Sequence, residues 1–206
     1  MEELFRLTLE IIGTFAFAIS GIRLASAKNF DLFGAYVVGL CTAIGGGTIR
    51  DLLLDVSPFW MHNSLYMICT GAALLLVLFF SGWLVKLKNT FFIFDTIGLG
   101  LFTVVGIEKT LALGFPFWVA IVMGTITGAA GGILRDVFIN EIPLIFRKEI
   151  YALACVIGGL FYWLALQFGF DVITAGIICA SAVMLCRILA VHFKIGLPIL
   201  RGKEPL

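Results

Sequence analysis

The chain has 206 residues, of which 61% are hydrophobic and 13% are charged, and its formal net charge at pH 7 is +1. A soluble domain is about half apolar and about a quarter charged, so an ordinary soluble protein is excluded, and the near-neutral charge argues against a nucleic-acid partner. Only helices and closed barrels satisfy the backbone in lipid. Because the apolar runs are long and continuous rather than alternating, we predict an all-α integral membrane protein.

Seven apolar segments approach the length of about 20 residues that a membrane-spanning helix needs. We predict transmembrane helices at residues 4–25, 31–57, 63–85, 91–110, 115–140, 149–168 and 172–193. The connections between them are short, and Pro58 and Pro143 follow the second and fifth segments, where proline fits a helix end. We therefore expect one transmembrane domain over residues 1–206.

The first six segments form two copies of a three-helix repeat, at about 4–85 and 91–168. Gly46 and Gly131 are 85 positions apart, and at this offset matching residues recur throughout: Glu10/Asp95, Gly13/Gly98, Phe17/Phe102, Gly21/Gly106, Gly39/Gly124, Pro58/Pro143 and Tyr66/Tyr151. Since the repeat has an odd number of spans, the second copy enters the bilayer from the opposite side, which is the inverted-repeat architecture. The helix at about 172–193 stands outside this symmetry.

The most distinctive motif is a glycine cluster followed by an Arg-Asp pair, and each repeat carries one copy. The first copy reads Gly45-Gly46-Gly47-Thr48-Ile49-Arg50-Asp51, and the second reads Ala130-Gly131-Gly132-Ile133-Leu134-Arg135-Asp136. Small residues four apart precede each cluster and favour close packing of two helices. The alternative is that both helices bend or break at the glycines, because glycine has the widest backbone freedom, and that freed carbonyls line a polar path at the midplane. Both interpretations can hold at once.

Arg50 and Arg135 have two interpretations of their own. They either extend to the membrane interface with their long side chains, or they form interior ion pairs or an electrostatic gate in a pore. Asp51 and Asp136 follow them directly, and adjacent residues are not expected to share a helix face. These aspartates would then cap, pair elsewhere or face a vestibule.

Glu10 and Asp95 are acids inside the first helix of each repeat. The inverted repeat places each acid at a depth similar to that of the arginine in its own repeat. We therefore predict the ion pairs Glu10–Arg50 and Asp95–Arg135, one towards each mouth of a pore.

Other polar residues suggest less chemistry. Arg187 lies late in the seventh helix, where an arginine at the interface is expected, and Lys109 reads as a loop lysine. The five cysteines lie in apolar segments without a CxxC pair, so we expect no metal site, disulfide or cofactor. No nucleophile–base arrangement or phosphate loop is present in the sequence, and we expect no enzyme activity.

Basic residues set the expected orientation. One side of the membrane receives Arg23, Lys28, Lys86, Lys88, Arg147, Lys148, Lys194, Arg201 and Lys203. The other side receives only Arg6 and Lys109. The N-terminus is therefore expected outside and the C-terminus in the cytoplasm, in a bacterial or archaeal plasma membrane.

The doubled motif, together with Gly21-Ile22-Arg23, resembles the prokaryotic branch of the trimeric intracellular cation channel family, which also carries a "glycine transporter" domain label. The resemblance implies a homotrimer with a pore in each subunit that passes monovalent cations, chiefly potassium but also sodium. It further implies that this pore lies between second and fifth helices kinked at Gly45–Gly47 and at Gly131–Gly132.

Two functions stay open from the sequence. The first is a potassium-permeable channel in which Arg50, Asp51, Arg135, Asp136, Glu10 and Asp95 act as pore or gating charges. The second is a secondary transporter of a small solute such as glycine, since inverted repeats with broken helices are common among transporters. Because buried charges are costly, a purely structural membrane protein fits less well.

Overall fold

The computed structural model describes the backbone of residues 1–86 and 90–198, and the side chains of residues 1–80 and 90–198. Within this part the chain forms α1 (Glu2–Ala27), α2 (Leu32–Leu53), α3 (Leu65–Lys86), α4 (Thr90–Ala112), α5 (Phe117–Phe138), α6 (Ala152–Gln167) and α7 (Val172–His192), with 3₁₀ turns η1 (Phe59–His62) and η2 (Leu144–Phe146). The predicted seven-helix, all-α architecture is confirmed.

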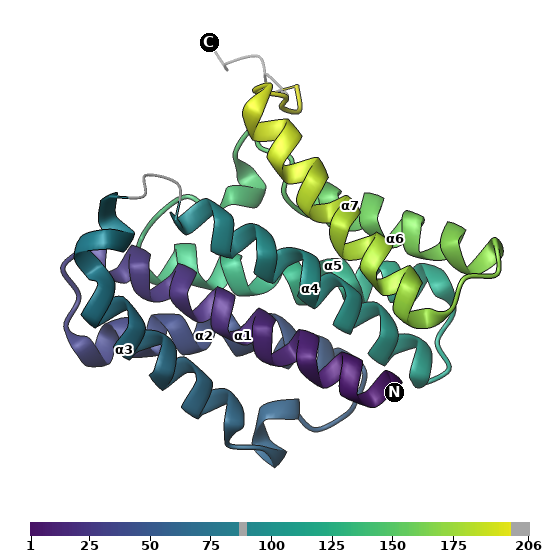
Figure 1. Cartoon of the computed structure of the whole chain (residues 1–206), viewed down its shortest axis with the longest axis horizontal. Helices are drawn as coiled ribbons and strands as arrows, with labels where there is room; N and C mark the ends of the chain where they lie inside the picture. Colours follow the sequence, from purple (N-terminus) through teal and green to yellow (C-terminus); the bar gives the residue numbers. More distant parts are fainter. Residues whose placement is uncertain (87–89, 199–206) are drawn as a thin grey trace, which may run out of the picture.

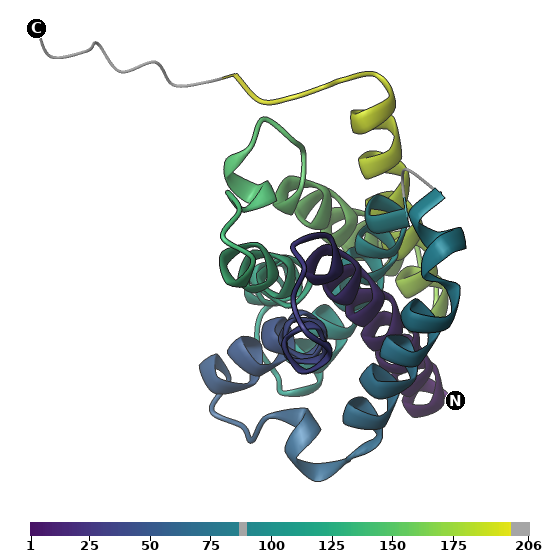
Figure 2. The same cartoon turned by 90° about the vertical axis from the view of Figure 1, so that its left-hand side faces the viewer.

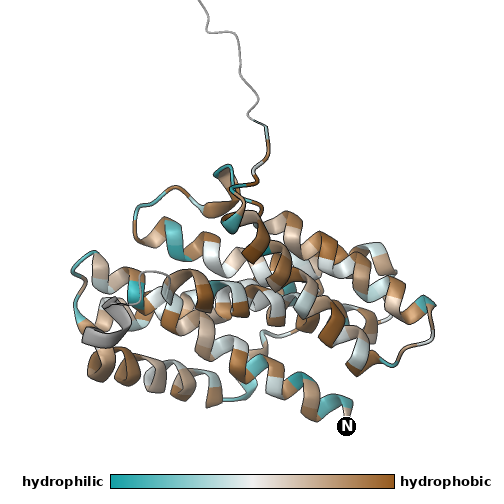
Figure 3. Cartoon of the chain, turned by 45° about the horizontal axis from the view of Figure 1, so that its top comes forward, coloured by the Kyte–Doolittle hydropathy of each residue, from teal (hydrophilic) through white to brown (hydrophobic). Residues whose placement is uncertain are grey.

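Five of these helices are long and apolar enough to cross a membrane within the described residues: α1, α2, α4, α5 and α7. The other two are apolar but shorter. α6 has 16 residues, and α3 is apolar over Leu65–Phe80, where non-helical backbone angles at Phe80 interrupt the helix. Hydrophobic residues dominate the helices, whereas hydrophilic residues concentrate at helix ends and connections (Figure 3). This distribution is that of a multi-pass membrane protein.

The predicted segments 31–57 and 115–140 extend past the ends of α2 and α5. Both helices end at related positions because the chain then turns through left-handed residues, Asp55 with φ 56° and Asn140 with φ 56°. Aspartate and asparagine tolerate this region better than other non-glycine residues. A proline and a 3₁₀ turn follow in each case. η1 and η2 lie at opposite ends of the molecule (Figures 1 and 2), as an inverted repeat requires.

Contacts between α1 and α4 follow the same symmetry. The rings of Phe17 and Phe102 stack with centroids 5.4 Å apart. Gly13 leaves room for the Phe102 ring, and Gly98 leaves room for the Phe17 ring. Phe17 and Phe102 are equivalent positions of the two repeats, and the repeat offset converts the Gly13–Phe102 contact into the Gly98–Phe17 contact. The pseudo-two-fold axis therefore passes between α1 and α4. α7 lies outside this symmetry and packs on α4 and α6 (Figure 1).

The backbones of α2 and α5 also touch at the axis. A Cβ atom added to Gly46 would overlap the carbonyl oxygen of Thr127, and one added to Gly131 would overlap the carbonyl oxygen of Thr42. The repeat offset converts each of these two contacts into the other. The glycines therefore make the central helix crossing possible, because any side chain at these positions would push the two helices apart.

We predict that Gly131→Ala destabilises the protein, because its methyl group meets backbone that cannot move aside, and overpacking typically costs about 1–3 kcal/mol. The matched control is Gly71→Ala in α3, where an added Cβ meets nothing within 4 Å. Thermal unfolding in detergent should show a lower midpoint for Gly131→Ala and an unchanged or higher one for Gly71→Ala. Equal midpoints for both variants would contradict this account of the crossing.

Candidate functional site

Arg135 is the centre of a buried polar cluster in the second repeat, with 0% of its surface exposed. Its Nη1 donates to Oδ1 of Asp95 at 2.5 Å and to Oγ of Ser20 at 2.7 Å, and its Nε donates to Oδ1 of Asp136 at 2.9 Å. The guanidinium thus joins α1, α4 and α5. The predicted Asp95–Arg135 pair is present, and Arg135 does not extend to the membrane interface.

Arg187 enters the same cluster from α7. It is 1% exposed, and its Nη1 donates to Oε2 of Glu149 at 3.2 Å and to the carbonyl oxygen of Ile150 at 2.9 Å. Its Nη2 lies 3.9 Å from Oδ2 of Asp95. The expectation of an interfacial arginine was wrong, because the loop before α6 folds back over the end of α7 and encloses the side chain.

Aromatic rings enclose these two guanidinium groups. The Cζ of Arg135 lies 4.5 Å from the ring centre of Phe91, and that of Arg187 lies 5.2 Å from Phe92 and 5.0 Å from Tyr151. Cation–π contacts of this kind stabilise a desolvated cation. The hydroxyl of Tyr151 also donates to Oδ1 of Asp95 at 3.4 Å. Two arginines therefore share the single carboxylate of Asp95 in a low-dielectric interior.

The first repeat builds a related but different cluster around Asp51. Its Oδ1 accepts from Nε of Arg50 at 2.8 Å and lies 2.8 Å from Nζ of Lys109. Its Oδ2 accepts from the backbone N–H of Phe59 at 2.8 Å. Both Arg50 and Asp51 are buried. Lys109 is therefore not a loop residue but the last-turn cation of α4, held against the Arg-Asp motif of α2.

The motif aspartates have one shared task in both repeats. Oδ2 of Asp136 accepts from the backbone N–H of Leu144 at 3.0 Å, as Asp51 does from Phe59. Each aspartate fixes the 3₁₀ turn after its helix and also binds the preceding arginine. From the helix faces we expected each aspartate to cap, pair elsewhere or face a vestibule; each in fact also pairs with its own neighbouring arginine, because an arginine side chain is long enough to turn back along the helix.

The prediction of a Glu10–Arg50 ion pair was wrong. Oε2 of Glu10 accepts from the hydroxyl of Tyr66 at 2.5 Å, and no ion pair between Glu10 and Arg50 occurs among the described residues. Arg50 is held instead by Asp51, while its Nη1 has no hydrogen-bond partner in that part of the chain. The halves differ because Lys109 corresponds to Leu24 in the first repeat and because Arg187 comes from the helix outside the symmetry.

The expected break at the glycines is absent. α2 is helical through Gly45, Gly46 and Gly47, and α5 is helical through Gly131 and Gly132. The clusters serve close contact instead, since Gly45 faces Leu134, Gly47 faces the Phe59 ring, and Gly132 makes room for the Tyr151 hydroxyl beside Asp95. The packing interpretation therefore describes this structure, and a bend of these helices stays a proposal.

Several residues of the two clusters were not predicted as site residues: Ser20, Tyr66, Lys109, Glu149, Tyr151 and Arg187. Tyr66 and Tyr151 had a usable signal, because both recur at the repeat offset and each hydroxyl donates to the matching acid of its own repeat. Symmetry could not reveal the others, because no matching residue stands at the repeat offset from Ser20, Lys109, Glu149 or Arg187.

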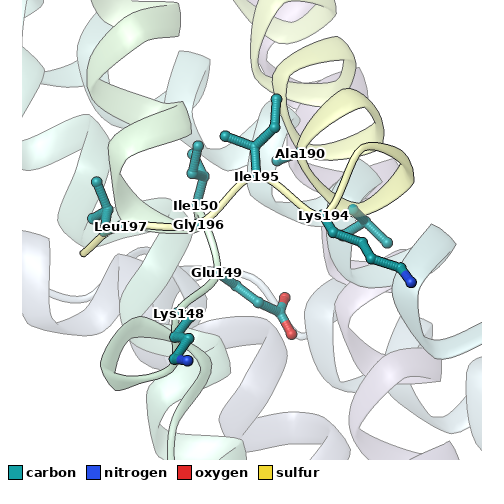
Figure 4. A pocket seen from close by; sticks show the side chains of 9 residues that line it. Lys148, Glu149, Ile150, Ala190, Lys194, Ile195, Gly196 and Leu197 are labelled. Carbon is teal, nitrogen blue, oxygen red and sulfur yellow. The ribbon is translucent and has the colours of Figure 1, made fainter. Parts of the chain in front are cut away.

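At the end of the molecule beyond Arg187, the C-terminal segment is tied back to the loop before α6. Glu149 and Gly196 form an antiparallel bridge, and the backbone N–H of Leu197 donates to the carbonyl of Lys148 at 3.2 Å. A cavity of about 390 Å³ lies between these two segments and the end of α7. Figure 4 shows the side chains of Lys148, Glu149 and Lys194 around it. The tie thus involves Glu149, the residue that holds Arg187.

The fold and these clusters define a class of protein: a seven-helix, inverted-repeat membrane protein with one buried polar cluster around the Arg-Asp pair of each repeat. A family model described as "Glycine transporter" matches the chain twice, at residues 7–82 and 92–167. A UPF0126 membrane protein of Vibrio cholerae is 39% identical over 198 residues, covering 92% of this chain and 80% of that protein. The UPF0126 inner membrane protein YadS of Escherichia coli is 38% identical over 193 residues, covering 92% and 93%.

Solved structures also match this chain over nearly its whole length. The TRIC trimeric intracellular cation channel orthologue from Rhodobacter sphaeroides matches with a TM-score of 0.87 and 32% identity, over 92% of this chain and 98% of that one. A prokaryotic TRIC channel in 0.5 M KCl matches with a TM-score of 0.86 and 30% identity, over 96% and 100%. The chain belongs to the prokaryotic, UPF0126 branch of the trimeric intracellular cation channel family and is a multi-pass inner membrane protein.

We predict energetic coupling between Arg135 and Asp95 but none between Arg50 and Glu10. Losing one partner of a buried pair leaves an uncompensated charge and typically costs about 3–5 kcal/mol. The Arg135→Met variant should therefore unfold at a lower denaturant concentration than the unmodified protein. Adding Asp95→Asn to this variant should restore part of the lost stability.

The second pair is the matched control for this cycle. Arg50→Met and Glu10→Gln should add simply, because no ion pair joins these residues. A double-mutant cycle that finds additivity for Arg135 with Asp95, or strong coupling for Arg50 with Glu10, would contradict the contacts described above.

Proposed function

We propose that this protein is a channel for monovalent cations, chiefly potassium and also sodium, with one pore in each subunit of a homotrimer. The observation that carries the proposal is the match to solved TRIC cation channels over nearly the whole of both chains. No resident cofactor or metal is required, and we infer no enzymatic activity.

The pathway that we propose runs between α2 and α5. Its narrowest point would be the central crossing, where Gly46 meets the carbonyl of Thr127 and Gly131 meets the carbonyl of Thr42. With the two backbones in contact, this arrangement fits a closed state. Opening would separate the helices or bend them at Gly45–Gly47 and Gly131–Gly132, where missing side chains leave the backbone most adaptable, and would expose carbonyl oxygens suited to cations.

The two clusters would act as charged gates on either side of the crossing. Arg50 and Lys109 compete for one oxygen of Asp51, and Arg135 and Arg187 both approach Asp95. Where two cations share a carboxylate, a small movement changes which contact is kept. We infer that Glu10, Asp51, Asp95 and Asp136 balance these cations, and that exchange of partners accompanies gating.

We propose an outward N-terminus and a cytoplasmic C-terminus. The support is the basic residues at the connections and ends, Arg23, Lys28, Arg147, Lys148 and Lys194. Lys86, Lys88, Arg201 and Lys203 would lie on the same side, but they fall outside the residues whose side chains the structure describes. The whole chain would then work as one transmembrane unit surrounded by lipid.

We predict unitary currents when the purified protein is reconstituted in planar bilayers under a potassium gradient. The currents should reverse near the potassium equilibrium potential, with modest selectivity over sodium because the sequence has no TVGYG-type filter. Silent bilayers together with saturable uptake of labelled glycine by proteoliposomes would overturn the channel and favour the second candidate, a small-solute transporter.

Lys109→Gln should shift the voltage at which half of the channels open. The substitution leaves Arg50 as the one cation bound to Asp51 and removes a positive charge beside the motif. The control is Lys28→Gln, which removes an ion pair with Glu141 in which both side chains are partly exposed; such surface pairs contribute little. Single-channel recordings in which Lys109→Gln gates like the unmodified protein would remove Lys109 from the gate.

A further inference from the structure

A second cavity, separate from both arginine clusters, lies where α1, α4, α6 and α7 meet. Its volume is about 370 Å³, within the range of small-molecule sites. Glu2, Glu3 and Arg6 from α1 line it together with Glu108 from α4, Tyr162 and Leu166 from α6. With all groups ionised, three carboxylates face one guanidinium, so the cavity carries a net negative charge.

Glu108 is the residue that points to a ligand. Only 9% of its surface is exposed, and its Oε1 has no hydrogen-bond partner. No ion pair to its carboxylate occurs among the described residues, although Arg6 lines the same cavity. A buried carboxylate oxygen without a hydrogen-bond partner is costly. A cation bearing N–H groups would satisfy it with charge-assisted hydrogen bonds.

The remaining walls select the kind of cation. No group of three or more acidic, histidine or cysteine side chains suited to a metal ion occurs in the part of the chain described, which argues against a chelated divalent ion. Leu111, Leu166 and Val172 contribute apolar surface. Tyr162 also lines the cavity; it is 1% exposed and its ring centroid lies 6.1 Å from that of Phe117, so packing fixes its position.

We propose that this cavity binds a primary ammonium group attached to an alkyl or acyl portion, with Glu108 as the anionic partner of the ammonium. Two sources have this chemistry: a free alkylamine, and the headgroup of an ethanolamine phospholipid at the membrane interface. The site is independent of the ion pathway, and its test does not need the protein to conduct.

The test is the apparent melting temperature of the detergent-solubilised full chain, titrated with n-butylammonium chloride. A saturable rise is expected, with none for n-butanol or for potassium chloride at equal ionic strength. Glu108→Gln should weaken the apparent affinity at least tenfold without impairing folding, because it removes an unpaired buried charge while keeping the shape. Glu141→Gln, at an acid paired elsewhere with Lys28, should leave the affinity unchanged.

Leu166→Trp provides a second variant that fills the cavity and keeps every charge, and it should also abolish the rise. A parallel titration compares ethanolamine with choline phospholipid, since choline has no N–H group to donate. Stabilisation by butylammonium identifies a site open to free amines, and stabilisation by the ethanolamine lipid alone identifies the lipid headgroup. The proposal is overturned if neither probe stabilises the protein saturably, or if Glu108→Gln and Leu166→Trp bind like the unmodified chain.

Discussion

The close contact of α2 and α5 is the constraint on which the rest of the structure depends. Gly46 and Gly131 each meet a threonine carbonyl of the facing helix, and the two contacts are related by the inverted repeat. Arg50 and Arg135 do not lie at this crossing. Each side chain instead lies about one turn beyond the glycines, where its own aspartate, a 3₁₀ turn and residues of neighbouring helices surround it.

Burial of the arginines then determines the composition of the two ends. A guanidinium held in a dry interior is stabilised by carboxylates, other hydrogen-bond acceptors and aromatic faces. Arg135 finds Asp95, Asp136 and Phe91 in its own repeat and Ser20 in α1 of the first repeat. Arg50 has fewer acceptors around it, and Lys109 from α4 of the second repeat adds a further cation to the carboxylate of Asp51 that Arg50 already binds. The inverted repeat thus builds two ends of similar backbone and different charge balance.

Much of this could be predicted from the sequence. Hydrophobic runs revealed seven helices, and the offset between repeats paired Asp95 with Arg135 correctly. The same reasoning failed for Glu10 and Arg50, because symmetry says nothing about positions that differ between the copies, such as Leu24 and Lys109. The burial of Arg187 depends on how the loop before α6 folds over α7, which no local pattern encodes. Glycine's backbone freedom permits a break but does not require one, and packing against the facing helix keeps α2 and α5 continuous.

The central claim, that cations pass between α2 and α5, is tested most directly by joining the two helices. Gly45 and Leu134 face each other across the crossing, so Gly45→Cys with Leu134→Cys, in a background lacking the five native cysteines, should form a disulfide there. The account predicts that oxidation abolishes the single-channel current and that reduction restores it, with disulfide formation verified by mass spectrometry. An oxidised, cross-linked protein that conducts as well as the reduced one would contradict it.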